Sequence, residues 1–226
     1  MKQGGNGMEN LSLMVQKTAV RFAKTGPAVY HSHHDMIRFW ERAIKRAELP
    51  VRLTQGFNPH LRIVFPHALG LGIASRHEEI ELEMYASVPL DALVERVRAA
   101  AGDTLEILGV TELPPVKKSR LVTECSYHIY GWNDVALAGL EQACAALMAR
   151  EEVIVERGAP GKRRSLDIRP FLLAVEFLPR ERAVFARLQH TLTGAARPDE
   201  VARLAAEATG TDARDLTIEK IGMLLE

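Results

Sequence analysis

The chain has 226 residues, enough to bury the core of one large domain or of two small ones. Its 29 basic and 29 acidic residues balance, so any nucleic-acid site must be a local patch rather than an overall field. Two cysteines, no secretory signal, and no apolar run near the roughly 20 residues that span a bilayer predict a reduced, cytoplasmic protein with no membrane partner.

The first half of the chain contains alternating strand and helix patterns. Residues 1–11 are polar and Gly-rich and are expected to form a flexible N-terminal tail. Alternating apolar residues and glutamates in 78–85 predict a half-exposed strand. Pro114 and Pro115 interrupt the pattern, so the first domain is expected to span 12–116. Its predicted elements are strand 13–22, helix 32–48, strand pieces 51–54 and 61–65, strand 78–85, helix 89–101 and strand 105–113.

The second half, residues 120–226, repeats this order. Each half reads β-α-β-β-α-β, which is typical of the ferredoxin-like fold. The sequence therefore predicts an α+β protein made of two tandem ferredoxin-like units. The predicted elements of the second domain are strand 123–130, helix 134–150, strand 153–155, a basic loop 157–169, a hairpin of 171–178 and 183–190, helix 198–208 and strand 216–225.

The start of the helix predicted at 32–48 combines a capping signal with imidazoles. Ser32 is the expected N-cap, and Asp35 complements the free N–H groups and the positive helix end. Met36, Ile37 and Trp40 begin an apolar stripe with helical spacing, so that side is expected to pack inward.

Six of the eight histidines fall within 47 residues, and they leave three interpretations open. They can hold the helix start and the following loop together through hydrogen bonds, bind a metal with Asp35, or serve in acid–base chemistry. No recognised zinc motif is present. We therefore assign no metal ligand and no catalytic residue, and expect His33 and Asp35 to contact a bound base or ligand. The six are His31, His33, His34, His60, His67 and His77.

The loop from Gln55 to His60 lies between two apolar runs and presents amides, an aromatic ring and an imidazole on one turn. Phe57 can stack on a base while Asn58 or His60 contacts a sugar or phosphate. The alternative is that Phe57 fills the core and Asn58-Pro59 only makes the turn. We predict Gln55, Phe57, Asn58 and His60 as base or ligand contacts.

Basic residues gather in two places. The predicted helix 32–48 carries an arginine stripe, and the loop 157–169 has five cations against one acid with a Gly-Ala-Pro-Gly tip. Each can be a solvated charge run or a phosphate-binding surface. The residues predicted to bind RNA phosphates are Arg38, Arg42, Lys162, Arg163, Arg164 and Arg169.

Four motifs together resemble the radical SAM-linked family, a domain of unknown function (DUF2344). They are an Arg-Phe-x-Lys-x-Gly strand at 21–26, a Ser-His-x-Asp helix start at 32–35, the Gln-Gly-Phe-Asn-Pro-His loop at 55–60, and a basic segment at 162–170 ending in Asp-Ile-Arg-Pro. His31, where the family usually has an apolar residue, and His34 depart from the pattern. The resemblance implies a radical SAM protein as partner. Two cysteines cannot hold a [4Fe–4S] cluster, so we expect no cofactor in this chain, and the cluster and SAM in the partner.

The leading expectation is an accessory module, more an adaptor than an enzyme, that binds tRNA or rRNA and presents it to the radical SAM partner. One alternative is a metal-independent endoribonuclease, because tandem ferredoxin-like folds also resemble CRISPR RNA-processing enzymes. His33 or His60 would then act as the general base, although the Gly-rich C-terminal loop of those enzymes is missing. A second alternative is a pure protein–protein adaptor.

Overall fold

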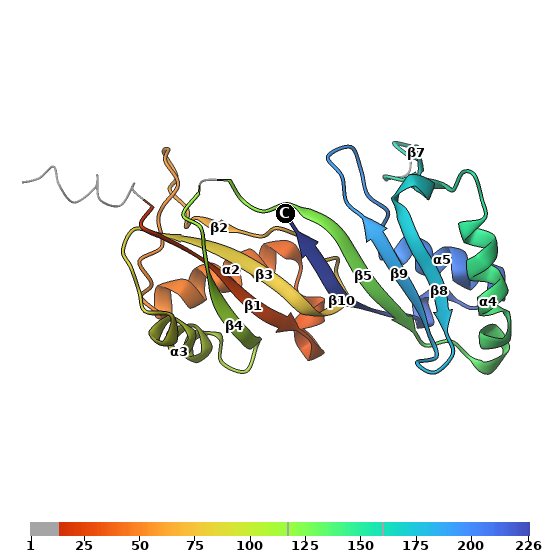
Figure 1. Cartoon of the computed structure of the whole chain (residues 1–226), viewed down its shortest axis with the longest axis horizontal. Coiled ribbons are helices and arrows are strands. Elements are labelled where there is room, and N and C mark those ends of the chain that lie inside the picture. The colour runs from red at the N-terminus through yellow and green to blue at the C-terminus, as the bar shows by residue number, and fades with distance from the viewer. Residues whose placement is uncertain (1–13, 117, 160) are drawn as a thin grey trace, which may run out of the picture. The chain divides into compact units, whose positions relative to one another are not determined.

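The computed structural model describes residues 14–116, 118–159 and 161–226, so the predicted tail at 1–11 lies outside the described residues. The protein is a mixed α+β structure, as predicted, and divides into two compact units, Met1–Leu121 and Val122–Glu226 (Figure 1). Among the helices that the structure describes, none is both long enough and apolar enough to cross a membrane.

The first unit is an antiparallel sheet with two α-helices. The sheet order is β4-β1-β3, and the short strand β2 pairs with β3. Its core lies between the sheet and the helices (Figure 1). The elements are β1 (Gln16–Lys24), η1 (Gly26–Tyr30), α2 (His33–Arg46), β2 (Ile63–Val64), β3 (Ala74–Met84), α3 (Leu90–Ala101) and β4 (Glu106–Leu113).

Helix α2 follows its sequence pattern. It begins after the N-cap Ser32 and buries one stripe, which includes Met36 and Trp40, in the core. It ends before Leu49-Pro50, because proline disfavours the helical conformation in the residue before it. The expected helix and its cap are both confirmed.

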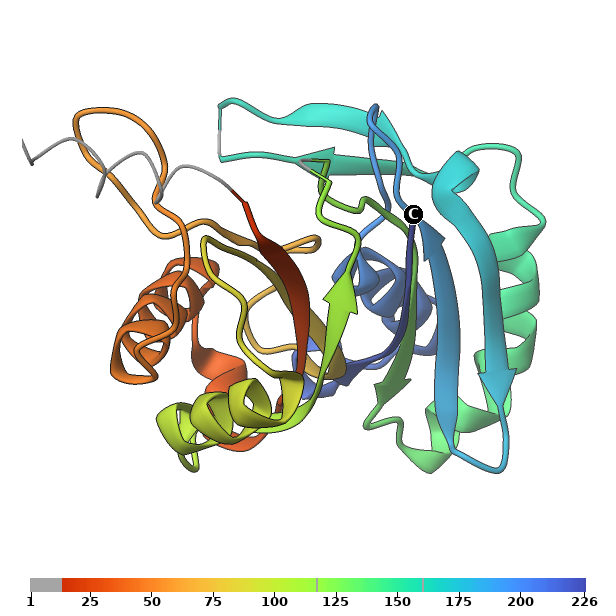
Figure 2. The same ribbon diagram turned by 60° about the vertical axis from the view of Figure 1, so that its left-hand side comes forward.

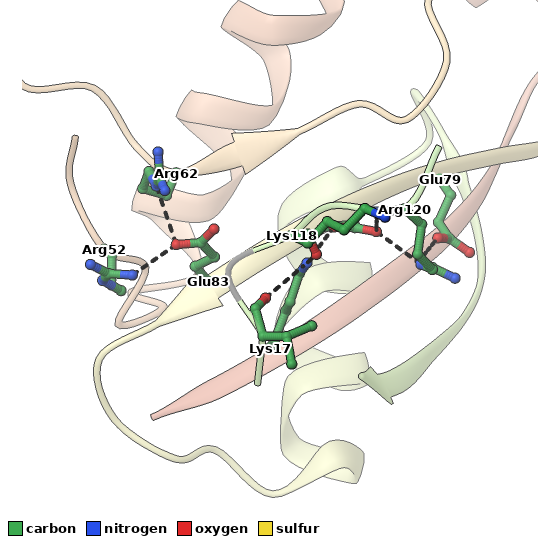
Figure 3. A network of polar contacts seen from close by, with 9 residues as sticks. Lys17, Arg52, Arg62, Glu79, Glu83, Lys118 and Arg120 are labelled. Atoms are coloured by element: carbon green, nitrogen blue, oxygen red, sulfur yellow. Dashed lines mark hydrogen bonds and ion pairs between the residues drawn. The ribbon is translucent and has the colours of Figure 1, made fainter. Parts of the chain in front are cut away.

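Strand β3 differs from the prediction of a half-exposed strand. Ile80, Leu82 and Met84 face the helices, as the alternation predicts. The glutamates of the opposite face, Glu79, Glu81 and Glu83, are nevertheless buried. The physical reason is that cations lie over them from residues far apart in the chain (Figure 3).

The second unit contains antiparallel strands in the order β10-β5-β9-β8, with helices α4 and α5 on one face (Figure 1). The predicted hairpin of 171–178 and 183–190 is confirmed as β8 and β9. The elements are β5 (Val122–Tyr130), α4 (Asp134–Met148), β6 (Ile154–Arg157), β7 (Arg164–Asp167), η2 (Arg169–Phe171), β8 (Leu172–Leu178), β9 (Ala183–Gln189), α5 (Pro198–Thr209), η3 (Ala213–Asp215) and β10 (Thr217–Leu225).

Two local predictions need correction. The strand piece at 51–54 is only a pair of isolated bridges, Val51 to Met84 and Leu53 to Leu61. The basic loop at 157–169 contains a strand, because β7 pairs with β6 to form a separate two-stranded hairpin. Val155 and Ile168 anchor this hairpin in the core, whereas the mostly polar sequence of β7 hides its strand character.

Candidate functional site

The capping interaction fixes the start of α2. Asp35 Oδ2 accepts hydrogen bonds from Ser32 N at 3.1 Å and Ser32 Oγ at 2.6 Å, and Asp35 N donates to Ser32 Oγ at 3.2 Å. The hydrogen bonds from Ser32 lower the pKa of Asp35. Asp35 therefore fixes the start of the helix. His33 is the first residue of this helix, so the cap also fixes the position of its backbone.

An open groove of about 530 Å³ runs along the outer side of α2, between this helix and residues 60–65. A volume of this size is in the range of small-ligand sites. Three of the predicted site residues, His33, Arg38 and His60, come together in its lining, although they are up to 27 positions apart. The other lining residues are His34, Ile37, Glu41, Leu61, Ile63, Val64 and Phe65.

His33 is the least exposed of the three imidazoles that line the groove. Its ring packs edge-on against Phe65, with centroids 5.1 Å apart. Burial, followed by the charges of His34 and Lys24, lowers its pKa. This shift favours the neutral imidazole, whose ring nitrogens can accept or donate a hydrogen bond in the groove.

His60 connects the loop 55–59 to the groove. Its backbone closes the loop, because Thr54 N donates to His60 O at 2.7 Å and His60 N donates to Thr54 Oγ1 at 2.9 Å. Its Nδ1 lies 3.7 Å from Glu41 Oε1 of α2. The loop is thus tied at its base to the helix that forms the other wall of the groove.

The tip of this loop is open to solvent. Phe57 is fully exposed, and Gln55 and Asn58 are exposed as well. The alternative that Phe57 fills the core is therefore wrong. None of these three residues lines the groove itself, and the loop meets the groove only at His60.

The predicted phosphate-binding residues fall into three groups. Arg38 and Arg42 are exposed on α2, and only Arg38 lines the groove. Lys162, Arg163 and Arg164 are exposed at the outer end of the β6–β7 hairpin, which extends beyond the end of β9 (Figure 2).

Arg169 instead has a structural role. Its guanidinium donates to the carbonyl oxygens of Met148 at 2.9 Å, Arg150 at 3.0 Å and Leu172 at 3.2 Å. It therefore satisfies carbonyl groups at the C-terminal end of α4, where cations are favourable. We do not carry Arg169 into the phosphate-binding set.

Comparison with protein families identifies the chain. The family model described as "Uncharacterized protein conserved in bacteria (DUF2344)" matches residues 17–198. The chain belongs to this family. The matched part of this DUF2344 protein includes the groove, the loop 55–59 and the β6–β7 hairpin.

Other comparisons of this DUF2344 protein give the fold alone. No curated protein matches it. Among solved structures it is similar to a chain in "Crystal Structure of a Cbf5-Nop10-Gar1 Complex", with a TM-score of 0.51 and 11% identity over 94% of this chain. It spans 50% of that chain, so it corresponds to about half of the longer protein.

Sequence reasoning missed Lys24, which lies behind the groove. With His33 and Glu78 it lines a cavity of about 10 Å³, room for about one water molecule. Burial lowers the pKa of Lys24, and the charge of Glu78 opposes this shift. The available signal was the strand motif at 21–26, because alternation along β1 places Lys24 on the same face as Phe22.

Proposed function

We propose that this DUF2344 protein is an RNA-binding accessory module that presents tRNA or rRNA to a radical SAM protein. The observation that carries the proposal is the groove, where an apolar floor lies between the cation Arg38 and the imidazoles His33 and His60. An apolar floor suits the face of a base, and a cationic rim suits a phosphate.

Two exposed features support RNA as the ligand. Phe57 presents an exposed ring on the loop next to the groove, where a second base can stack. The β6–β7 hairpin carries three exposed cations on a short, projecting element, which suits a phosphate backbone. On a chain with no net charge, such local groups are what would direct RNA to particular surfaces.

We propose further that each unit is ferredoxin-like, so that the chain is a tandem of two such units. The strand order β4-β1-β3-β2 in the first unit and β10-β5-β9-β8 in the second supports this assignment, since each is the same arrangement of a β-α-β-β-α-β chain. In the second unit the β6–β7 hairpin is then an insertion after the first helix.

The radical SAM partner is inferred from the resemblance of the four motifs to the radical SAM-linked family. In this proposal the partner holds the iron–sulfur cluster and SAM, because the two cysteines of this chain cannot supply the ligands of a [4Fe–4S] cluster. The complex would act in the cytoplasm. Co-expression with a radical SAM protein encoded nearby, followed by pull-down with and without ribonuclease, tests the pairing.

Replacing Arg163 and Arg164 with alanine is expected to weaken RNA binding and to reduce the slope of log Kd against log salt by about two. The reason is that each phosphate contact releases roughly one counterion. Titration of labelled tRNA at several salt concentrations measures both quantities. The matched control is Arg203→Ala with Arg214→Ala, which removes two exposed arginines of the same unit. Equal binding by the two double variants would remove the hairpin from the RNA site.

The neutral imidazole of His33 in the groove favours one second candidate, a metal-independent endoribonuclease with His33 as general base. RNA incubated with the protein in excess EDTA separates the two functions. The accessory module is expected to cut nothing. Cleavage that is lost in His33→Ala but kept in the control His77→Ala, outside the groove lining, would instead establish the enzyme. A stable partner complex with no RNA affinity would leave a pure adaptor.

A further inference from the structure

The face of the second-unit sheet opposite α4 and α5 carries three aromatic rings on its two central strands. Along β5, Cys125, Tyr127 and Ile129 point to the helix-covered core, so alternation places His128 and Tyr130 on the other face. Along β9, Val184 and Ala186 lie in the core, and Phe185 is therefore on that face too. All three rings are half-buried rather than enclosed.

The three rings form one connected cluster. His128 and Phe185 are direct cross-strand partners, with ring centroids 6.1 Å apart and planes at 74°. His128 and Tyr130 lie 5.6 Å apart at 89°, and His128 Nδ1 is 2.9 Å from Tyr130 Oη. Burial, then the charges of Glu219 and Glu181, raises the pKa of Tyr130, so its phenol keeps the proton that it can donate to His128. These contacts fix the orientation of the rings before any ligand arrives.

A shallow part of the face adjoins the cluster. Ser126 on β5 is paired with Gly222 on β10 and with Arg187 on β9. A Cβ atom placed on Gly222 would meet Ser126 Cβ at 3.5 Å, so the two small residues lie close to each other. Arg187 is about half exposed, and its Nε lies 3.9 Å from Glu124 Oε2. The face thus carries the rings at one level of β5 and β9 and, next to them, the small residues Gly222 and Ser126 and the cation Arg187 side by side across β10, β5 and β9.

Charge along this face is mixed. Glu219 is the strand partner of His128, and Glu176 is the partner of Phe185. Cations lie toward the other end, at Arg187 and in the β6–β7 hairpin beyond the end of β9 (Figure 2). Carboxylates can accept hydrogen bonds from the amino groups of bases, and cations bind phosphates. The distribution suits a strand whose bases lie on the rings and whose backbone leaves toward the hairpin.

We propose that this face, formed by His128, Tyr130 and Phe185 with Arg187, binds single-stranded RNA by stacking unpaired bases on the rings. This inference rests on the proposed RNA-binding function and adds its substrate class, because rings on a sheet surface can reach bases only where these are unpaired. Duplex RNA hides its base faces, so this surface discriminates against it. Aromatic residues on the sheet of an RNA-recognition motif work in the same physical way.

The test uses the full chain with a fluorescent 12-nucleotide single-stranded RNA containing 2-aminopurine, and a 12-base-pair RNA duplex as competitor. Phe185→Ala is expected to weaken single-strand binding about tenfold and to reduce the stacking quench of 2-aminopurine. Phe185→Tyr keeps a ring and should restore both. Val135→Ala, an exposed apolar change on α4 on the other side of the sheet, is the matched control and should change neither.

The outcomes separate this inference from the proposed function. Binding of RNA with unchanged affinity and quench in Phe185→Ala, or equal affinity for duplex and single strand, overturns the sheet-face site and leaves RNA binding standing. No binding of any RNA by the unmodified protein overturns both. Circular dichroism melting of each variant confirms that the fold is kept.

Discussion

Replacing Glu81 with glutamine is expected to lower the free energy of unfolding by about 3–5 kcal/mol. Glu81 is 0% exposed, and its Oε2 lies 2.7 Å from the ammonium of Lys17, which is only 2% exposed. Its Oε1 accepts from Arg120 Nε at 2.9 Å. Glutamine has nearly the same shape, so the loss is electrostatic: the buried ammonium of Lys17 and the half-buried guanidinium of Arg120 lose the carboxylate between them. Urea unfolding followed by circular dichroism measures the difference.

The same network explains why the cost is high at this position. Lys17 Nζ also donates to the carbonyl of Lys118 at 3.0 Å, and Arg120 contacts Glu79. These bonds tie the segment around residues 118–120 to the sheet of the first unit. A variant that removes both members of the fully buried pair, Lys17→Met with Glu81→Met, is expected to be less destabilised than Glu81→Gln, because no buried ammonium is left without its carboxylate.

The effect also has a defined pH dependence. Burial opposes ionisation of Glu81, but hydrogen bonds from Lys17 and Arg120 outweigh burial and lower its pKa. A lowered carboxyl pKa stabilises the fold at pH values above the pKa of an unfolded glutamate, and this contribution is lost as the pH falls through the lowered value. The difference in unfolding free energy between the unmodified protein and Glu81→Gln should therefore shrink toward acid pH.

The exposed pair Arg76 and Glu106 provides the control. Their side chains are each 58% exposed and lie 3.2 Å apart. Exposed ion pairs contribute about 0–1 kcal/mol because water screens them. Arg76→Ala should therefore change stability little. A loss as large as that of Glu81→Gln would show that burial does not distinguish the two pairs.

Local interactions are what the sequence could predict in the first unit. The cap of α2 depends on Ser32 and Asp35, three positions apart, and the apolar stripe has helical spacing. Both are readable without knowing the rest of the fold. The loop 55–59 was likewise identified by its turn residues, although the choice between a buried and an exposed Phe57 needed the structure.

What could not be predicted depends on long-range pairing. Alternation in β3 places Glu79, Glu81 and Glu83 on one face. Two parts of the chain cover this face, Lys17 and the segment with Lys118 and Arg120, and they are about 100 positions apart in the sequence. No local pattern shows that they meet over that face. The groove could not be predicted for the same reason. The apolar residues at 61–65 have the pattern of a core strand, and only the position of α2 beside them shows that they line a groove.

Arg169 shows that a cluster of cations in the sequence does not by itself predict a phosphate-binding surface. A run of cations predicts a positive surface, but each side chain can instead serve a structural contact. Arg169 binds three backbone carbonyls, and Arg157 binds Glu200 through two nitrogens, at 2.6 and 2.7 Å. Only the three cations at the outer end of the hairpin remain exposed. Charge counting therefore overstates a binding surface wherever helix ends or buried acids need partners.

Replacing Trp40 with alanine is expected to lower the free energy of unfolding by about 3–5 kcal/mol, through lost burial and the cavity left behind. Trp40 is 0% exposed at the centre of the first-unit core. Its ring packs edge-on against Phe22 at 5.1 Å and Phe39 at 5.7 Å between centroids. Chemical unfolding followed by circular dichroism gives the value, since the variant lacks the indole fluorophore of this unit.

Trp40→Phe separates packing from polarity at the same position. The indole Nε1 is buried and has no hydrogen-bond partner among the residues that the structure describes. A buried donor without a partner costs about 1–3 kcal/mol, so phenylalanine removes that cost while keeping a ring against Phe22 and Phe39. The loss in Trp40→Phe should therefore be clearly smaller than in Trp40→Ala. Equal losses would mean that the indole N–H is satisfied in solution, and that its hydrogen bond, as well as the aromatic packing, stabilises the core behind the groove.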